Sequence, residues 1–264
     1  MNIRPLFVAA AAAASFAHAQ EVERAPFITT PSDVVERMLR FAGTGPADLV
    51  VDLGSGDGRI VITAALEFGA RGLGIELDRA LVEKSRDSAR AAQVADRVSF
   101  VQGNVLFADL SQASVVTVYL LPGLINQLQP RFIAELKPGT RIVSHAFAMA
   151  GWKPDRTESV RLAQRHPGQG DESRLYLWVV PAKTRGVWQG DDLRLQISQN
   201  FQEIEVEGVA AGKPLADARA SLTGSDIAWE ARGLRFRGRV EGDRIVGELS
   251  RDGSSSHLEL KRRP

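Results

Sequence analysis

The chain has 264 residues, with 33 lysines and arginines against 32 aspartates and glutamates, and it has no cysteine. This length suits one α/β domain together with a smaller second domain. The net charge of +1 excludes a protein that binds nucleic acid through an overall basic field. The lack of cysteine excludes disulfides, thiolate catalysis and cysteine-ligated metals.

The first twenty residues differ from the rest of the chain. Arg4 supplies a positive charge, residues 6–16 form an apolar run rich in alanine, and Ala17-His18-Ala19 fits a small-x-small cleavage site. The run is too short to span a bilayer. We therefore expect a signal peptide over 1–19 and a periplasmic or secreted protein. A disordered leader on a cytoplasmic protein is the alternative.

Strand and helix patterns alternate from Thr30 onward. A helix is expected to start with Thr30 as its cap and Asp33 closing a capping box, and to end at Gly43. Further strands are predicted over 49–53, 72–77, 98–102, 115–121 and 140–146, and further helices over 59–68, 78–93 and 130–136. This alternation predicts a parallel sheet with right-handed crossovers.

Two more strand-like runs, 159–164 and 174–180, flank a turn-rich loop over 166–172. They predict an antiparallel hairpin at the sheet edge, a feature that a dinucleotide-binding fold lacks. The expected fold class is thus α/β, with a seven-stranded, doubly wound, Rossmann-like sheet over 26–182.

Short runs with a period of two residues follow Lys183, and Gly, Asp, Asn or Ser separates most of them. This pattern predicts a small C-terminal antiparallel β-barrel or sandwich over 186–264. Arg235, Arg237 and Arg239 would share one strand face. Such a basic stripe would suit an acidic partner or an anionic membrane surface in the cell envelope, and a plain solvated face is the alternative.

A glycine-rich turn after the first predicted strand indicates which ligand the protein binds. Gly54 and Gly56 let the backbone turn sharply and let a ligand lie against bare main chain. Acids flank this turn at Asp52 and Asp57, which disfavours a pyrophosphate and favours a ligand with an ammonium and a sulfonium, such as S-adenosylmethionine (SAM). Glu76 ends the next strand, where a carboxylate can accept from ribose hydroxyls. A nucleotide-dependent oxidoreductase is the weaker alternative.

Four segments, 26–31, 52–61, 118–122 and 137–145, carry a family resemblance. Together they resemble class I SAM-dependent methyltransferases, in particular the family of mitochondrial protein-lysine methyltransferases that act on the ATP synthase c-subunit and the adenine nucleotide translocase. The resemblance covers about Pro26 to Pro181. Its motifs are specific for the family and only suggestive for lysine as the acceptor.

The resemblance implies a role for particular residues. SAM would be held by Thr30, Asp52, Gly54, Ser55, Gly56, Asp57, Glu76 and Asn104, and the acceptor would meet Tyr119 and Pro122. Thr30 as a plain helix cap, Asn104 as a turn residue and Tyr119 as a buried strand residue are the alternatives. His145 is expected to be structural, and Trp152 to line the pocket or to cover the core.

These observations predict an enzyme that transfers a methyl group from SAM to an amine, on a protein lysine or a small molecule. No metal-binding spacing is evident, and no nucleic-acid partner is expected. A signal peptide motivates a second hypothesis, because SAM is made in the cytoplasm. Under it, the chain is an exported non-catalytic SAM-fold protein whose C-terminal β-domain mediates binding.

Overall fold

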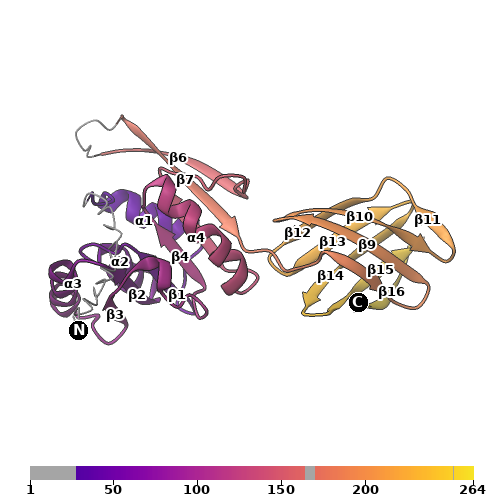
Figure 1. The fold of residues 1–264 in the computed structure, drawn as a ribbon, viewed down its shortest axis with the longest axis horizontal. Coiled ribbons are helices and arrows are strands. Elements are labelled where there is room, and N and C mark those ends of the chain that lie inside the picture. Colours follow the sequence, from indigo (N-terminus) through magenta and orange to yellow (C-terminus); the bar gives the residue numbers. More distant parts are fainter. Residues whose placement is uncertain (1–27, 164–169, 252) are drawn as a thin grey trace, which may run out of the picture.

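A computed structural model describes residues 28–163, 170–251 and 253–264. The expected signal peptide, Pro26 and Phe27 of the family pattern, and much of the loop over 166–172 lie outside the described residues. Two separate sheets make up the protein (Figure 1), a mixed α/β layer followed by an all-β part. Within the described residues, no helix is long and apolar enough to cross a membrane.

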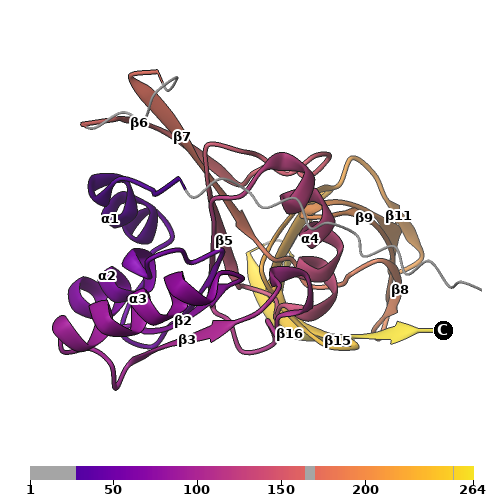
Figure 2. The same cartoon turned by 60° about the vertical axis from the view of Figure 1, so that its left-hand side comes forward.

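The first sheet has seven strands in the order β3-β2-β1-β4-β5-β7-β6. Its strands are β1 Leu49–Leu53, β2 Arg71–Glu76, β3 Val98–Gln102, β4 Val115–Val118, β5 Arg141–His145, β6 Arg156–Arg161 and β7 Glu172–Val179. Strands β1 to β5 are parallel, and β7 runs antiparallel to both β5 and β6. The expected fold class and the edge hairpin are both confirmed, and the hairpin of β6 and β7 extends beyond the sheet (Figure 2).

Helices cover both faces of this sheet. They are α1 Ser32–Phe41, α2 Arg59–Phe68, α3 Arg79–Ala91 and α4 Pro122–Glu135, with a short 3-10 turn over Val105–Phe107. Neighbouring strand residues point to opposite faces, so Val50 packs in the apolar cluster under α1, α2 and α3, whereas Val51 packs in the cluster under α4. Burial on both faces explains why the central strands β1 and β4 are nearly continuous apolar runs.

Several element boundaries differ from the sequence expectation. The fourth strand ends at Val118, and the helix expected over 130–136 begins at Pro122. Proline is well suited to the first helical position, so Pro122 starts α4 although Pro130 lies inside it. Helix α1 begins at Ser32 without a side-chain cap, so the predicted capping box is wrong. The sixth strand lies three residues earlier than expected.

The second sheet has nine antiparallel strands in the order β11-β10-β9-β8-β16-β15-β14-β13-β12. They are β8 Gly186–Gln189, β9 Leu193–Asn200, β10 Glu203–Ala210, β11 Lys213–Leu215, β12 Arg219–Thr223, β13 Asp226–Ala231, β14 Leu234–Glu241, β15 Arg244–Arg251 and β16 Ser254–Arg263. The sheet curls around a core that includes Trp188, Trp229 and Phe236. This confirms a curled antiparallel β-structure at the C-terminus.

The arginines of β14 are not an isolated basic stripe. Arg235 stands opposite Glu230 and forms an ion pair with it at 3.4 Å, while Arg237 stands opposite Glu248 on β15. A third arginine, Arg239, pairs with Asp226, also at 3.4 Å. The acids of the neighbouring strands therefore balance the positive charge of this face. A membrane-surface or acidic partner for the face stays a prediction.

Candidate functional site

The glycine turn follows β1 at the carboxyl edge of the first sheet. Gly54 and Gly56 have φ of +80° and +54°, which favours glycine. A Cβ on Gly54 would lie 2.8 Å from the Leu120 side chain, so the turn also needs glycine for space. The N–H groups of Gly54 and Ser55 both donate to the carbonyl of Ile75, at 2.9 and 3.0 Å. These bonds fix the turn against the end of β2.

Glu76 stands at the end of β2 beside this turn. Its carboxylate accepts from the N–H of Gly56 at 2.9 Å and from the N–H of Asp78 at 2.9 Å. Both bonds hold the half-buried carboxylate at the lip of the glycine turn. This is the position from which an acid accepts hydrogen bonds from the ribose of a ligand that lies over the turn.

Asp52 is a buried carboxyl, 2% exposed, and Thr117 donates a hydrogen bond of 2.7 Å to its Oδ1. Burial raises its pKa to about 7, against the hydrogen bond from Thr117 and with help from the charges of Glu76 and Asp57. A carboxyl in such a place is stabilised in its ionised form by a nearby cation. These properties suit a carboxyl that binds a cation, and the contact of Asp52 with the ammonium group of SAM stays a prediction.

Asp57 has a partner that the sequence analysis missed. Its carboxylate accepts from Arg59 Nε at 2.9 Å and from Arg59 Nη2 at 2.7 Å, and Lys84 lies 4.0 Å away. Burial alone would raise the pKa of Asp57, but Arg59 and Lys84 together hold it below its ordinary value. Arg59 also donates to the carbonyl of Thr30 at 2.9 Å. Asp57 thus orients Arg59, which is bonded to Thr30, two residues before the start of α1. A contact between Asp57 and SAM stays a prediction.

Ser55 and Asn104 lie where the sequence places them, at the glycine turn and after β3. The Ser55 hydroxyl is buried against β2, and a Cβ on Gly74 would lie 2.6 Å from its Oγ. The Asn104 Oδ1 accepts from the N–H of Leu106 at 2.9 Å and thereby caps the 3-10 turn. Each side chain therefore has a local structural role, and its role toward the cofactor stays a prediction.

Aromatic side chains gather at the ends of β4 and β5. The ring of Tyr119 lies 4.2 Å from that of His145 and 6.4 Å from that of Phe147, measured between ring centroids. Thr30 places its hydroxyl oxygen 3.4 Å from His145 Nδ1, a pairing across 115 residues that a helix cap would not make. Burial raises the pKa of Tyr119. The rings of Tyr119, His145 and Phe147 thus form an aromatic wall at this edge, and the hydroxyl of Thr30 contacts His145.

Two further predicted residues differ in their exposure. Pro122 is exposed and is the first residue of α4, three positions after Tyr119. Trp152 is 1% exposed and packs in the apolar cluster under α4. The structure therefore gives Trp152 the role of covering the core. Phe147 stacks on Tyr119, but the sequence analysis did not select it. Its aromatic character, two positions beyond the end of β5, was the feature that could have indicated it.

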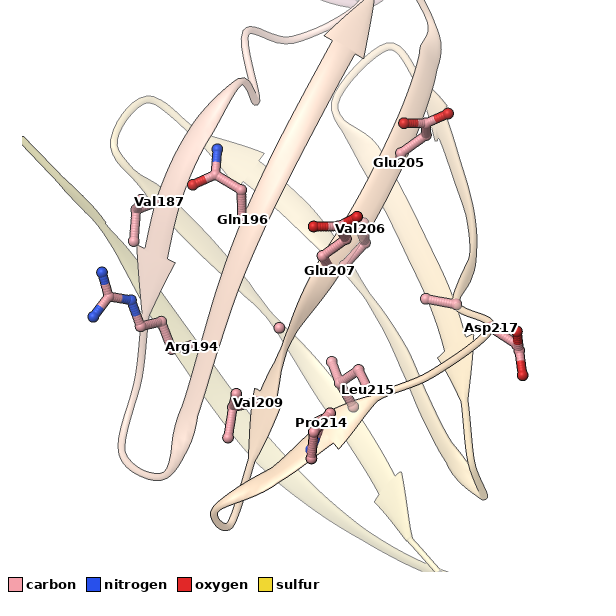
Figure 3. Close-up of a pocket in the computed structure, with 12 residues that line it drawn as sticks. Val187, Arg194, Gln196, Glu205, Val206, Glu207, Val209, Pro214, Leu215 and Asp217 are labelled. Carbon is pink, nitrogen blue, oxygen red and sulfur yellow. The ribbon is translucent and has the colours of Figure 1, made fainter.

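A groove also lies on the second sheet, along β9, β10 and β11 (Figure 3). Arg194, Glu205, Glu207, Pro214 and Leu215 contribute to its lining. Figure 3 shows that the charged ends of Glu205 and Arg194 point apart and do not converge on one point. This groove lacks the combination of buried acid, glycine turn and aromatic wall found at the first sheet.

Comparison with known proteins finds relatives of the part of the chain that forms the first sheet. A family model described as the ANTKMT methyltransferase domain matches residues 52–156, from Asp52 to the start of β6. A protein-lysine N-methyltransferase of Saccharolobus islandicus (strain REY15A) is 42% identical over 134 residues, which cover 50% of this chain and 83% of that protein. In Mus musculus, the lysine N-methyltransferase of the ATP synthase c-subunit is 38% identical over 135 residues, and the match spans 53% of its length.

A solved structure, described as an RNA methyltransferase from Salinibacter ruber in complex with S-adenosyl-L-homocysteine, is 47% identical. It aligns with a TM-score of 0.53 and covers 60% of this chain and 96% of its own. The matches to the two lysine methyltransferases and to this structure each cover 50–60% of the chain, about the share that the α/β part occupies. The chain therefore belongs to the ANTKMT methyltransferase family and is an enzyme that transfers a methyl group from S-adenosylmethionine.

Proposed function

We propose that this methyltransferase acts on the side-chain nitrogen of a protein lysine. The observation that carries the proposal is the aromatic wall of Tyr119, His145 and Phe147 at the end of β4, the strand that pairs with β1 at the buried acid Asp52. Aromatic faces attract a cationic or partly charged nitrogen and can orient it. Support also comes from the relatives in Saccharolobus islandicus and Mus musculus, which are described as lysine N-methyltransferases.

Some residues of this chain would bind SAM, and others would position the acceptor. Glu76 and the glycine turn would hold the ribose side of SAM, and Asp52 would hold its ammonium group. SAM supplies a methyl group on a cationic sulfur, and that sulfur leaves as a neutral thioether when the carbon–sulfur bond breaks. The rings of Tyr119 and Phe147 would border the path of the lysine nitrogen. They would thereby hold this nitrogen collinear with the methyl carbon and the sulfur of the breaking bond.

A lysine must lose its proton before its nitrogen can attack. The half-buried site around Tyr119 favours the neutral amine, because burial lowers the pKa of an ammonium group. The proton then leaves to solvent before the new nitrogen–carbon bond forms. No general base is required of His145, which lies 0% exposed behind Tyr119.

An RNA acceptor is the second candidate, because the 47% identical structure is described as an RNA methyltransferase. One experiment separates the two candidates. The purified chain is incubated with SAM carrying a labelled methyl group and with cell extract divided into protein and RNA fractions. Hydrolysis of each fraction then shows whether the label is in N-methyl-lysine or in a methylated nucleoside.

Label in N-methyl-lysine supports the proposal, whereas label confined to nucleosides overturns it. Glu76→Ala is the variant expected to transfer much less to both fractions at limiting SAM, since it removes the carboxylate at the glycine turn. Tyr119→Ala should lose transfer to lysine while it retains SAM binding. Tyr176→Phe is the matched control, because Tyr176 is the other tyrosine of the chain and lies on β7.

A further inference from the structure

The second sheet contacts the first through the turn between β9 and β10, at Phe201 and Gln202. The ring of Phe201 stacks on Trp152 with centroids 5.0 Å apart and planes 6° from parallel. Phe201 packs against the apolar cluster under α4, which belongs to the first sheet. The tip of one sheet therefore completes the core of the other.

Gln202 adds two hydrogen bonds to this contact. Its Oε1 accepts from Trp152 Nε1 at 2.8 Å, and its Nε2 donates to the carbonyl of Lys153 at 2.7 Å. Trp178 Nε1 also donates to the carbonyl of Trp152, at 2.9 Å. A single glutamine thus uses both ends of its amide to hold one point of the connection between β5 and β6.

The other end of the same connection forms the aromatic wall. After β5 the backbone turns at Ala146, whose φ is +68°, and Ser144 Oγ donates to the carbonyl of Phe147 at 2.6 Å. The ring of Phe147 then stacks on Tyr119. Between the two ends, the N–H of Ala150 donates to Asn126 Oδ1 of α4 at 2.9 Å. The segment 146–153 is thus held at its start, its middle and its end.

We infer that Phe201 and Gln202 are positioning residues for methyl transfer, which hold segment 146–153 so that Phe147 stays against Tyr119. The inference rests on the proposed function, in that it places the acceptor nitrogen beside Tyr119. Displacement of a wall by about 1 Å is enough to weaken alignment of the reacting atoms. The C-terminal sheet would thereby act on the reaction without touching either substrate.

The test uses the full chain and the two tyrosines that it contains, Tyr119 and Tyr176. Tyrosine labelled with carbon-13 gives a separate NMR ring signal for each of the two residues. The signal that is missing in Tyr119→Phe belongs to Tyr119, and its change with pH gives the pKa of Tyr119. The variants are Phe201→Ala and Gln202→Met, with Phe201→Tyr as the conservative replacement that keeps the stack. Gln196→Ala, at an exposed position on β9, is the matched control.

Phe201→Ala and Gln202→Met should shift the Tyr119 signal and lower its pKa toward the ordinary value, because looser packing of Phe147 lets water reach the ring. SAM affinity should stay within about twofold of wild type, because the glycine turn, Asp52 and Glu76 are untouched. Phe201→Tyr adds a third tyrosine signal, but its Tyr119 signal and pKa should match wild type, as should those of Gln196→Ala. Gln202→Met replaces a half-buried glutamine by a side chain of similar size, so this variant should fold even if Phe201→Ala does not.

An unchanged Tyr119 signal and pKa in folded Gln202→Met would overturn the inference. So would an equal shift in Gln196→Ala. The outcome is independent of the acceptor, because no acceptor is added. If the enzyme proves to methylate RNA, the proposed function fails while the tyrosine titration still decides whether Phe201 and Gln202 position the wall.

Discussion

Thr117 on β4 stands directly opposite Asp52 on β1 and donates a hydrogen bond of 2.7 Å to its carboxyl group. Both side chains are buried in the middle of a parallel sheet. Without a ligand, the hydroxyl of Thr117 provides this carboxyl with a donor, yet burial still raises the pKa of Asp52 to about 7. The candidate cofactor site thus contains an acid that destabilises the unliganded fold when it ionises.

Asp52→Asn should stabilise the unliganded protein while it weakens SAM binding. The folded state keeps the Asp52 proton from its ordinary pKa of 3.8 up to about 7, whereas the unfolded chain has already lost it. The contribution of this group to stability therefore falls as pH rises through that window and is constant above it. Asparagine does not titrate and can still accept from Thr117.

The advantage of Asp52→Asn should consequently grow between pH 4 and pH 7 and reach on the order of 2–4 kcal/mol in free energy of unfolding. Denaturant unfolding at several pH values measures it. A difference that stays constant with pH would contradict the raised pKa of Asp52.

Glu76→Ala should weaken SAM binding by about 1.5–3 kcal/mol, the cost of losing a hydrogen bond to a charged group. Isothermal calorimetry with SAM measures the loss. Glu67→Ala, at an exposed position on α2, is the control and should bind as wild type. Wild-type affinity in folded Glu76→Ala would show that this carboxylate does not contact the cofactor.

A chain ending at Lys183 should still fold and bind SAM, because the seven-stranded sheet is complete at Val179. Loss of Phe201 would expose Trp152, which is 1% exposed in the full chain. We expect a red shift of tryptophan emission and a loss of about 1–3 kcal/mol in unfolding free energy. Failure of the shortened chain to bind SAM would make the second sheet part of the methyltransferase core.

Export is a separate prediction, and it depends on the sequence of residues 1–19. Cell fractionation followed by N-terminal sequencing should recover a mature chain that begins at Gln20 in the cell envelope or outside it. A protein found in the cytoplasm and still carrying Asn2 would contradict export. A cytoplasmic location would also give the enzyme direct access to SAM, because SAM is made in the cytoplasm.

The sequence was sufficient for the parts of the site that depend on local pattern. An apolar run predicted β1, the alternation of strand and helix patterns predicted β2, and the glycines between Asp52 and Arg59 predicted the turn into α2, because backbone conformation there depends on glycine itself. The start of α4 was missed because two prolines, Pro122 and Pro130, both resemble helix starts, and only packing decides between them.

Contacts between distant parts of the chain could not be predicted in this way. The sequence offered Thr30 as a helix cap, but its hydroxyl lies against His145, which is 115 residues away in the chain. Likewise, no local pattern relates Trp152 to Phe201, which stack across the two sheets. Such pairings depend on tertiary geometry, and neither propensity nor periodicity encodes them.

The contact between Phe201 and Trp152 has a consequence for how the molecule moves in solution. A second contact lies elsewhere, where the N–H of Ala182 donates to the carbonyl of Gly224 at 2.8 Å, and a Cβ on Gly224 would lie 3.0 Å from Gly139 Cα. Attachment at two separate places leaves no single bond about which one sheet can swivel against the other. Nuclear spin relaxation should therefore give both sheets the same rotational correlation time, as for one rigid particle.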